Sequence, residues 1–210
     1  MLTTTRKAQI EVASEDNRRV LDLYEDGFSL QAYELAATIG PLESWSGTAA
    51  RIVAGRIAMN VGAPRLAIAH HVRARRDDPT DPEANYYYVR AMLGRKGPLH
   101  ALNFFRSIGE LDDAPDAIRA DWHATRAIAL GTLRDFDAAD AWLARAEEAR
   151  PEWPWVQVER ASLLEMEDRY EPALEAGRHA LELRPWYRPA VQSVARTLQL
   201  LHRDREALDI

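Results

Sequence analysis

Histidine is the residue type in this sequence with the widest chemical reach, because it can bind metal ions and transfer protons near neutral pH. The chain contains His70, His71, His100, His123, His179 and His202. No two of them are three or four residues apart, which is the spacing that places two ligands on one face of a helix. The adjacent pair His70 and His71 would point about 100° apart on a helix. The sequence therefore predicts no metal site.

Motifs for nucleophilic catalysis and for phosphate binding are also missing. The sequence has no cysteine, which excludes thiolate ligands and cysteine nucleophiles. It has no GxSxG string, and the glycine-containing stretch 93–98 matches neither GxxxxGK[ST] nor GxGxxG. That stretch is typical of a turn between helices, and the carboxylates belong to solvated helix faces. We therefore expect no cofactor, no catalytic site and no enzymatic activity in this chain.

Composition narrows the range of partners. The 210 residues are 47% hydrophobic and 29% charged, which is typical of a folded protein. The net charge of −6 does not supply the concentrated basic face that a nucleic-acid backbone requires. No apolar run is long enough for a secretory signal or a membrane span. These features predict a cytoplasmic protein that binds neither nucleic acid nor membrane.

A 34-residue period organises the elements that carry these side chains. Residues 126–151 align without a gap on residues 160–185, so that Ala127 falls on Ala161. Within each period the apolar residues have helical spacing, while strand signals are sparse. One interval in the middle of the chain is four residues longer, and we expect its extra residues in the polar stretch 110–116. The sequence therefore predicts stacked pairs of helices.

This pattern resembles the tetratricopeptide repeat (TPR), in which small residues let two antiparallel helices pack closely and a proline ends each unit. The small position of the first helix is held by Gly55, Ala91, Ala127, Ala161 and Ala195. The alanine of the second helix is held by Ala67, Ala101, Ala139, Ala173 and Ala207. The sequence departs from the family at the early aromatic position, where Arg51, His123, Gln157 and Val191 stand, and at Ile108. The resemblance covers about residues 48–210 and is looser from about residue 14.

The resemblance implies an all-α fold, a right-handed α-solenoid of stacked antiparallel helix pairs with about five to six units. We expect one domain, 1–210, with units at about 14–40 (weak), 48–79, 82–115, 116–151, 154–185 and 188–210 (incomplete). Pro64 and Pro98 are expected in the first turns of second helices, and Asp135 and Asp204 as N-caps. The alternative is a helical bundle without a true repeat.

The last unit stops three residues after Ala207, and Leu208 and Ile210 are apolar at this open end. Because repeat arrays normally end in a helix with a polar outer face, we expect the natural protein to continue past residue 210. The alternative is a natural terminus that frays or self-associates.

In the TPR family, one side of each first helix faces a concave groove that holds extended peptides or partner helices. On a helix, this side contains the positions at −6, −3, −2, +1, +4 and +5 from the small residue. Here they place a peptide-binding or partner-binding groove at Arg56, Asn60, Asn85, Tyr88, Arg95, Lys96, Asp121, Thr125, Trp155, Glu159, Ser162, Glu165, Gln192, Arg196 and Gln199. Its charge changes from basic to acidic and back to basic, which favours a mixed-charge peptide. The alternative is a groove covered by the rest of the same chain.

Two further groups allow a functional and a structural interpretation. Arg90, Arg126 and Arg160 each precede a small position; they are either a ladder for an anionic ligand or, as we favour, stems paired with nearby acids. The aromatic runs 86–88, 153–155 and 186–187 lie at unit boundaries. They either form an adhesive edge for a partner or, as we favour, wedge adjacent units together.

Three functions are compatible with these features. The first is a protein–protein interaction scaffold that binds a peptide or a partner domain. The second is an N-terminal docking or regulatory arm of a larger bacterial enzyme, for example a peptidase, with its catalytic domain beyond residue 210. The third is self-association through the uncapped C-terminal end.

Overall fold

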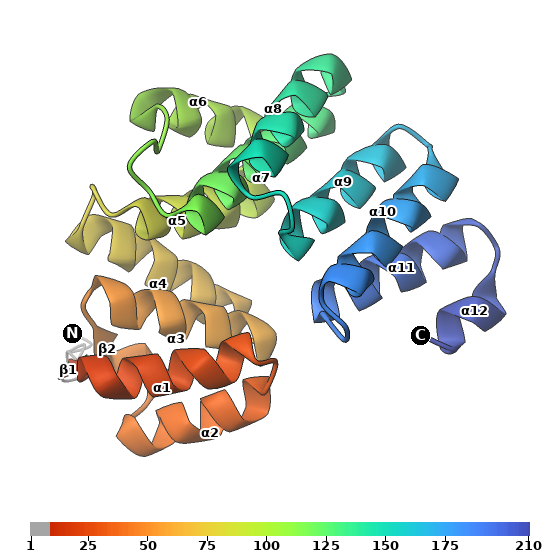
Figure 1. Cartoon of the computed structure of the whole chain (residues 1–210). Coiled ribbons are helices and arrows are strands. Elements are labelled where there is room, and N and C mark those ends of the chain that lie inside the picture. The colour runs from red at the N-terminus through yellow and green to blue at the C-terminus, as the bar shows by residue number, and fades with distance from the viewer. Residues whose placement is uncertain (1–8) are drawn as a thin grey trace, which may run out of the picture. The chain divides into compact units, whose positions relative to one another are not determined.

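The computed structural model describes residues 9–210, which are almost entirely helical (Figure 1). The chain divides into two compact units, residues 1–91 and 92–210. The N-terminal unit contains β1 (Ile10–Glu11), α1 (Ser14–Glu25), α2 (Ser29–Ile39), η1 (Leu42–Ser44), β2 (Trp45–Ser46), α3 (Thr48–Asn60) and α4 (Pro64–Asp77). Helix α5 (Pro82–Lys96) contributes residues to both units.

The C-terminal unit continues with seven helices, of which the last six form three consecutive pairs. They are α6 (Pro98–Ile108), α7 (Asp116–Thr132), α8 (Phe136–Ala149), α9 (Pro154–Met166), α10 (Tyr170–Leu183), α11 (Arg188–Leu200) and α12 (Asp204–Leu208). Within the two units, α1 packs on α2, α3 on α4, α7 on α8, α9 on α10 and α11 on α12. The helices therefore follow the pairing that the 34-residue period predicts.

The turn from each first helix to its second helix repeats one backbone conformation. A residue with positive φ ends the first helix at Gly27, Gly62, Gly97, Arg134, Asp168 and His202. In five of these turns, the next backbone N–H donates to a carbonyl five residues earlier, as from Asp135 to Leu130 at 3.1 Å. This is the Schellman motif, which satisfies the last carbonyls of a helix. The sequence signals only the three glycines, because Arg134, Asp168 and His202 rarely adopt positive φ.

The starts of the second helices only partly follow the prediction. Pro64 and Pro98 lie in the first turns of α4 and α6, as expected. Asp135 has the N-cap position of α8, but its side chain makes no capping hydrogen bond among the described residues. The prediction for Asp204 was wrong, since Arg203 is the N-cap and Asp204 is the first residue of α12. The repeated αL turn already fixes the chain direction here, so a side-chain cap is not required.

Two local features depart from the simple repeat. The connection between α6 and α7 spans residues 109–115, whereas α8 and α9 are joined by 150–153, and α7 has 17 residues where α9 has 13, so both the connection and the helix after it are longer in this unit. Near the N-terminus, β1 and β2 form a short parallel pair in which Ile10 is opposite Trp45. The indole of Trp45 is 1% exposed and donates to the carbonyl of Gly40 at 3.2 Å. No alternation of apolar and polar residues in the sequence predicts this pair of two-residue strands.

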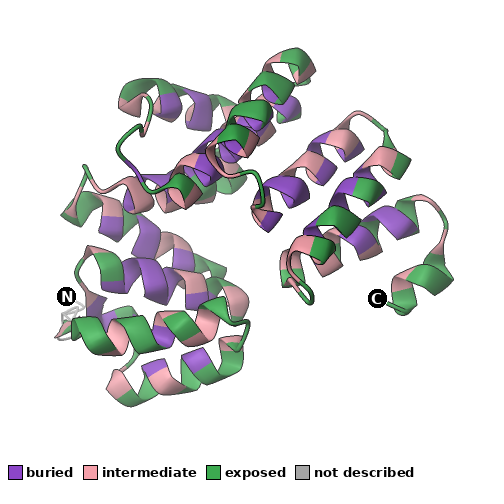
Figure 2. Ribbon diagram, in the orientation of Figure 1, coloured by how far each residue is buried: buried purple, intermediate pink, exposed green. Residues whose placement is uncertain are grey.

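Small residues set how closely the helices pack. A Cβ added at Gly55 would lie 2.4 Å from Cε1 of His71, and one at Gly131 would lie 2.4 Å from Cδ1 of Leu163. Buried residues run along α3 and α7, which Figure 2 shows in purple. Larger side chains fill the remaining space in each unit, among them Trp45 and Ile57 in the first and Trp122, Phe105 and Leu143 in the second. Small residues therefore allow close approach both within a helix pair, as at Gly55, and between neighbouring pairs, as at Gly131, while larger side chains fill the rest of each core.

Candidate functional site

The first helices of the C-terminal unit form a continuous surface. Helix α7 packs on α9, and α9 packs on α11, so positions 34 residues apart lie in rows across the three helices. We define the first-helix stripe as Thr125, Ile128, Trp155, Glu159, Ser162, Met166, Ser193 and Arg196. Along each helix these residues recur every three or four positions, which places them on one face. All of them except Thr125 are at least partly exposed.

The first-helix stripe combines several chemistries within a small area. Trp155, Ile128 and Met166 offer apolar surface, while Glu159 and Arg196 carry opposite charges on neighbouring helices. The Ser162 hydroxyl donates to the carbonyl of Val158 at 3.0 Å, so this small side chain adds little volume to the surface of α9. Ile128, Met166 and Ser193 were not among the predicted groove residues, although their helical spacing from Thr125, Ser162 and Arg196 places them on the same face. The stripe can contact a peptide through apolar, acidic and basic side chains.

Glu165 was predicted on the groove but lies between α9 and α11. Its side chain is 4% exposed and forms an ion pair with Arg196. The hydroxyl of Thr197 donates to Glu165 Oε1 at 2.6 Å. These contacts join two predicted site residues, Glu165 and Arg196, and fasten one first helix to the next. Gln192 and Gln199 lie on α11 and are exposed.

Asp121, another predicted groove residue, joins two units of the repeat. The indole Nε1 of Trp153 donates to Asp121 Oδ1 at 2.7 Å. The guanidinium of Arg150 lies 3.7 Å from the centre of the Trp153 ring. Trp153 is therefore a wedge between units, as favoured for the boundary aromatics. Trp186 differs, because it is 84% exposed.

In the N-terminal unit, Arg56 and Asn60 are held by α1. Arg56 pairs with Glu25 at 3.2 Å, and its guanidinium lies 4.7 Å from the centre of the Tyr24 ring. The amide of Asn60 donates to the Tyr24 hydroxyl at 3.0 Å. The structure thus brings these two predicted residues together around one tyrosine. Their contacts stabilise the packing of α1 on α3.

The other predicted residues on α5 have different surroundings. Asn85 is buried and donates to the carbonyl of Pro79 at 3.0 Å. The guanidinium of Arg75 lies 5.2 Å from the centre of the Tyr88 ring. Arg95 and Lys96 are exposed at the end of the helix.

The arginines that precede the small positions are paired with neighbouring groups. Arg160 Nε lies 2.7 Å from Glu147 Oε1, and Arg126 Nη1 lies 3.5 Å from Glu110 Oε1. Arg90 donates to the Tyr86 hydroxyl at 3.3 Å. These contacts agree with the favoured interpretation, in which the arginines are internal partners and not a ladder for a ligand.

Three histidines are buried and kept neutral. Burial, reinforced by nearby arginines, lowers the pKa of His70 to about 4 and that of His123 to about 4. Burial also lowers the pKa of His71 to about 3. The His71 ring stacks on Tyr87 with their centres 5.0 Å apart. These side chains belong to the packing of the helices, and their protonation would disturb it.

Residues 9–210 contain neither a cluster of metal-binding side chains nor a membrane-spanning helix. No three histidine or acidic side chains gather closely enough to hold a metal ion. None of the helices is long and apolar enough to cross a membrane.

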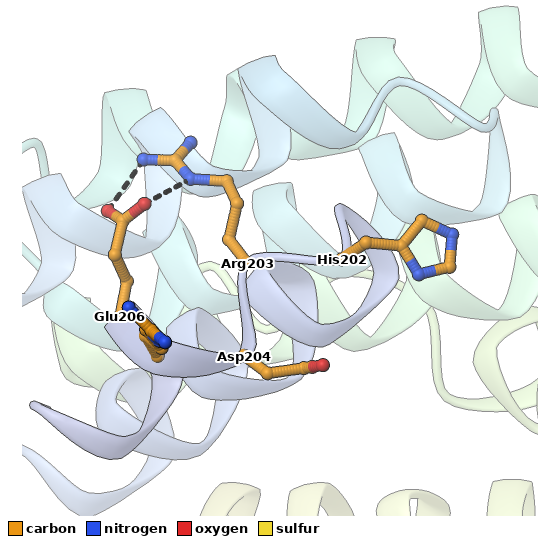
Figure 3. A pocket seen from close by; sticks show the side chains of 5 residues that line it. His202, Arg203, Asp204 and Glu206 are labelled. Atoms are coloured by element: carbon orange, nitrogen blue, oxygen red, sulfur yellow. Dashed lines mark hydrogen bonds and ion pairs between the residues drawn. The ribbon is translucent and has the colours of Figure 1, made fainter.

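A surface pocket at the start of α12 is occupied by an internal ion pair (Figure 3). Arg203 binds both carboxylate oxygens of Glu206, from Nε to Oε1 and from Nη2 to Oε2, each at 2.7 Å. The hydrogen bonds from Arg203 lower the pKa of Glu206. His202 and Asp204 line the same pocket. The pair fastens the start of this short helix and offers no separate chemistry.

Comparison with known proteins identifies the fold. No protein-family model and no curated protein sequence matches the chain. Among solved structures, a thermophilic TPR protein of Thermus thermophilus is 19% identical, with 93% of this chain and 98% of that chain covered and a TM-score of 0.62. PilW, a widely conserved type IV pilus biogenesis factor, is 15% identical, with coverage of 94% and 91% and a TM-score of 0.60.

A third similar structure is that of Cut9 in the hetero-tetramer Cut9-Hcn1 of the APC/C. It is 17% identical, with a TM-score of 0.61, and 85% of this chain spans 35% of that one. The chain therefore has the TPR fold, an all-α repeat solenoid, which confirms the predicted resemblance and fold class.

Proposed function

We propose that the chain is a protein–protein interaction scaffold that binds an extended peptide of a partner along the first-helix stripe. The observation that carries this proposal is the row of three adjacent first helices, which presents Trp155, Glu159 and Arg196 on one accessible face. A partly exposed aromatic side chain on the same face as opposite charges is typical of a protein contact surface. The TPR fold of the chain supports the same class of function.

The spacing of the helices limits the length of the peptide. Packed helices lie about 8–10 Å apart, so the stripe from α7 to α11 spans about 16–20 Å. An extended chain rises about 3.3 Å per residue, so about six residues cross the stripe. We expect an apolar residue against Trp155, a basic residue beside Glu159 and an acidic residue beside Arg196. Such a peptide fits the mixed charge that the sequence predicts.

The matched pair Glu159→Arg and Glu175→Arg tests this proposal. Glu175 is exposed on α10, a second helix, so both variants make the same charge change on different faces. A peptide is first selected from a displayed library against the wild-type chain, and its affinity is measured by fluorescence anisotropy. We expect Glu159→Arg to weaken binding at least about tenfold, because it juxtaposes like charges. Glu175→Arg should change the affinity less than about twofold.

Equal effects of the two variants, or no effect of Glu159→Arg, would show that the peptide binds elsewhere. Arg56→Glu is a poor probe of the groove, because it also breaks the contact with Glu25. The docking arm of a bacterial enzyme, self-association, the cytoplasmic location and the bounds of the units stay predictions.

A further inference from the structure

A second charged surface lies away from the first-helix stripe, where α7 meets α8. The guanidinium of Arg126 lies 3.6 Å from the centre of the Trp142 ring, and that of Arg145 lies 4.3 Å from the same centre. Both arginines therefore hold the indole by cation–π contacts. Arg126 is about 200° around α7 from the stripe residue Ile128. The two surfaces are thus distinct faces of the same helix.

One carboxylate from the 109–115 connection enters this surface. Glu110 Oε2 lies 3.1 Å from Arg145 Nη2, and Glu110 Oε1 lies 3.5 Å from Arg126 Nη1. In the next unit, the equivalent arginine Arg160 is paired with Glu147, which is part of helix α8. Glu110 takes the role of that acid but comes from an irregular segment. Glu110 is therefore not held in place by a helix backbone, as Glu147 is.

Among the described residues, Glu110 leaves two buried nitrogens of this surface without a hydrogen-bond partner. His123 is 5% exposed, and its Nδ1 is 3.9 Å from Glu110 Oε2, too far for a hydrogen bond. This nitrogen and the buried Nε of Arg126 have no hydrogen-bond partner in the described part of the chain. Buried donors are normally satisfied. A carboxylate of another molecule is not tied to the 109–115 connection. It can therefore lie deeper than Glu110 and reach these nitrogens.

The connection itself is acidic, and Arg119 donates to its Asp112 carbonyl at 3.2 Å. It carries Asp112 and Asp113 and leads into Asp116, which pairs with Arg119 at 2.7 Å. The contacts of Glu110 are partly exposed, with side-chain exposures of 33% for Glu110 and 44% for Arg145. Exposed ion pairs of this kind are weak. A ligand of the same chemistry can therefore compete with Glu110.

We propose that Arg126, Arg145 and Trp142 form an acceptor site for an acidic side chain of a partner protein, and that Glu110 is its intramolecular stand-in. The choice of ligand follows from the occupant, which is a glutamate in an acidic segment. Binding of the partner displaces Glu110, so the 109–115 connection sets the threshold for binding. This site does not depend on the first-helix stripe.

Removal of the stand-in tests the proposal. Binding of a fluorescein-labelled hexaglutamate peptide is measured by anisotropy at low ionic strength, with a hexaglutamine peptide as the uncharged control. Glu110→Gln should tighten hexaglutamate binding by about two- to fivefold, as expected for loss of a weak competing ion pair. Asp113→Asn makes the same charge change nearby and should alter binding by less than about 1.5-fold. Hexaglutamine should bind neither variant.

A second step shows where the peptide binds. Adding Arg145→Gln to Glu110→Gln should abolish the gain, and Arg145 is exposed enough for the variant to fold. An equal gain in Glu110→Gln and Asp113→Asn would overturn the proposal in favour of general electrostatics. No gain in Glu110→Gln, or a gain that survives Arg145→Gln, would also overturn it. None of these results affects the stripe, which the Glu159→Arg and Glu175→Arg pair tests separately.

Discussion

Replacing Gly62 and Gly94 in turn by alanine should change the stability of this chain in opposite directions. Both glycines are exposed, and an added Cβ at either would meet no atom of the described residues within 4 Å. Packing therefore contributes nothing to either change. The backbone alone differs: Gly62 ends α3 with φ 83°, whereas Gly94 lies within helix α5.

The expected magnitudes follow from these two conformations. Positive φ costs alanine about 1–2 kcal/mol, and the loss of glycine's freedom in the unfolded chain returns about 0.4–1 kcal/mol. Gly62→Ala should thus destabilise the fold by about 1 kcal/mol. Within a helix, alanine is better than glycine by about 0.5–1 kcal/mol, so Gly94→Ala should be stabilising.

Thermal unfolding followed by circular dichroism measures both effects. For a chain of this size, 1 kcal/mol corresponds to about 2–4 °C in Tm. We expect a lower midpoint for Gly62→Ala and a higher one for Gly94→Ala. Gly97→Ala, in the same unit as Gly94 and with φ 84°, should behave like Gly62→Ala. Shifts of the same sign for Gly94→Ala and Gly97→Ala would refute the assignment of the αL turns.

Three other predictions concern buried contacts. Gly131→Ala should destabilise the C-terminal unit by about 1–3 kcal/mol, because the new Cβ would lie 2.4 Å from Leu163 Cδ1, and urea unfolding would show it. Thr197→Val should cost about 1–3 kcal/mol by removing the donor to buried Glu165, and an unchanged urea midpoint would contradict that contact. His70 and His71 have folded pKa values of about 4 and about 3, below the unfolded value of 6.5. Since the unfolded chain then binds more protons, the free energy of unfolding should fall by up to about 1.4 kcal/mol per pH unit per histidine as pH drops from about 6.5 to about 4. Urea midpoints across this range should decline less when both histidines are replaced by asparagine.

Much of the fold is predictable because small residues recur at fixed positions of the repeat. Ala127 and Ala161 mark where helices must approach closely, and their 34-residue spacing fixes the pairing. The αL turns at Arg134 and Asp168 were not predictable, because the helices on either side, and not the residue type, impose positive φ at these positions. The β1–β2 pair is likewise joined by contacts between residues far apart in the sequence, such as the hydrogen bond from the Ser46 hydroxyl to the carbonyl of Ile10 at 2.9 Å.

The candidate site was predictable in outline and not in detail. Helical spacing predicted that Trp155, Glu159 and Ser162 share one face of a helix, and all three lie on α9. Spacing does not reveal which neighbouring helix a side chain meets, so it could not foresee that Glu165 binds Thr197. For the same reason, helical spacing could not predict that Arg56 pairs with Glu25, which lies on α1, a helix far earlier in the sequence.

The most direct test of the interaction surface is a map of backbone amide chemical shifts during titration with the selected peptide. We expect the largest changes on α7, α9 and α11, centred on Trp155, Glu159 and Arg196, with small changes on α10. Glu159→Arg should remove them. Changes concentrated on the second helices α8 and α10, with the first helices unaffected, would contradict the proposal that the first-helix stripe binds the peptide.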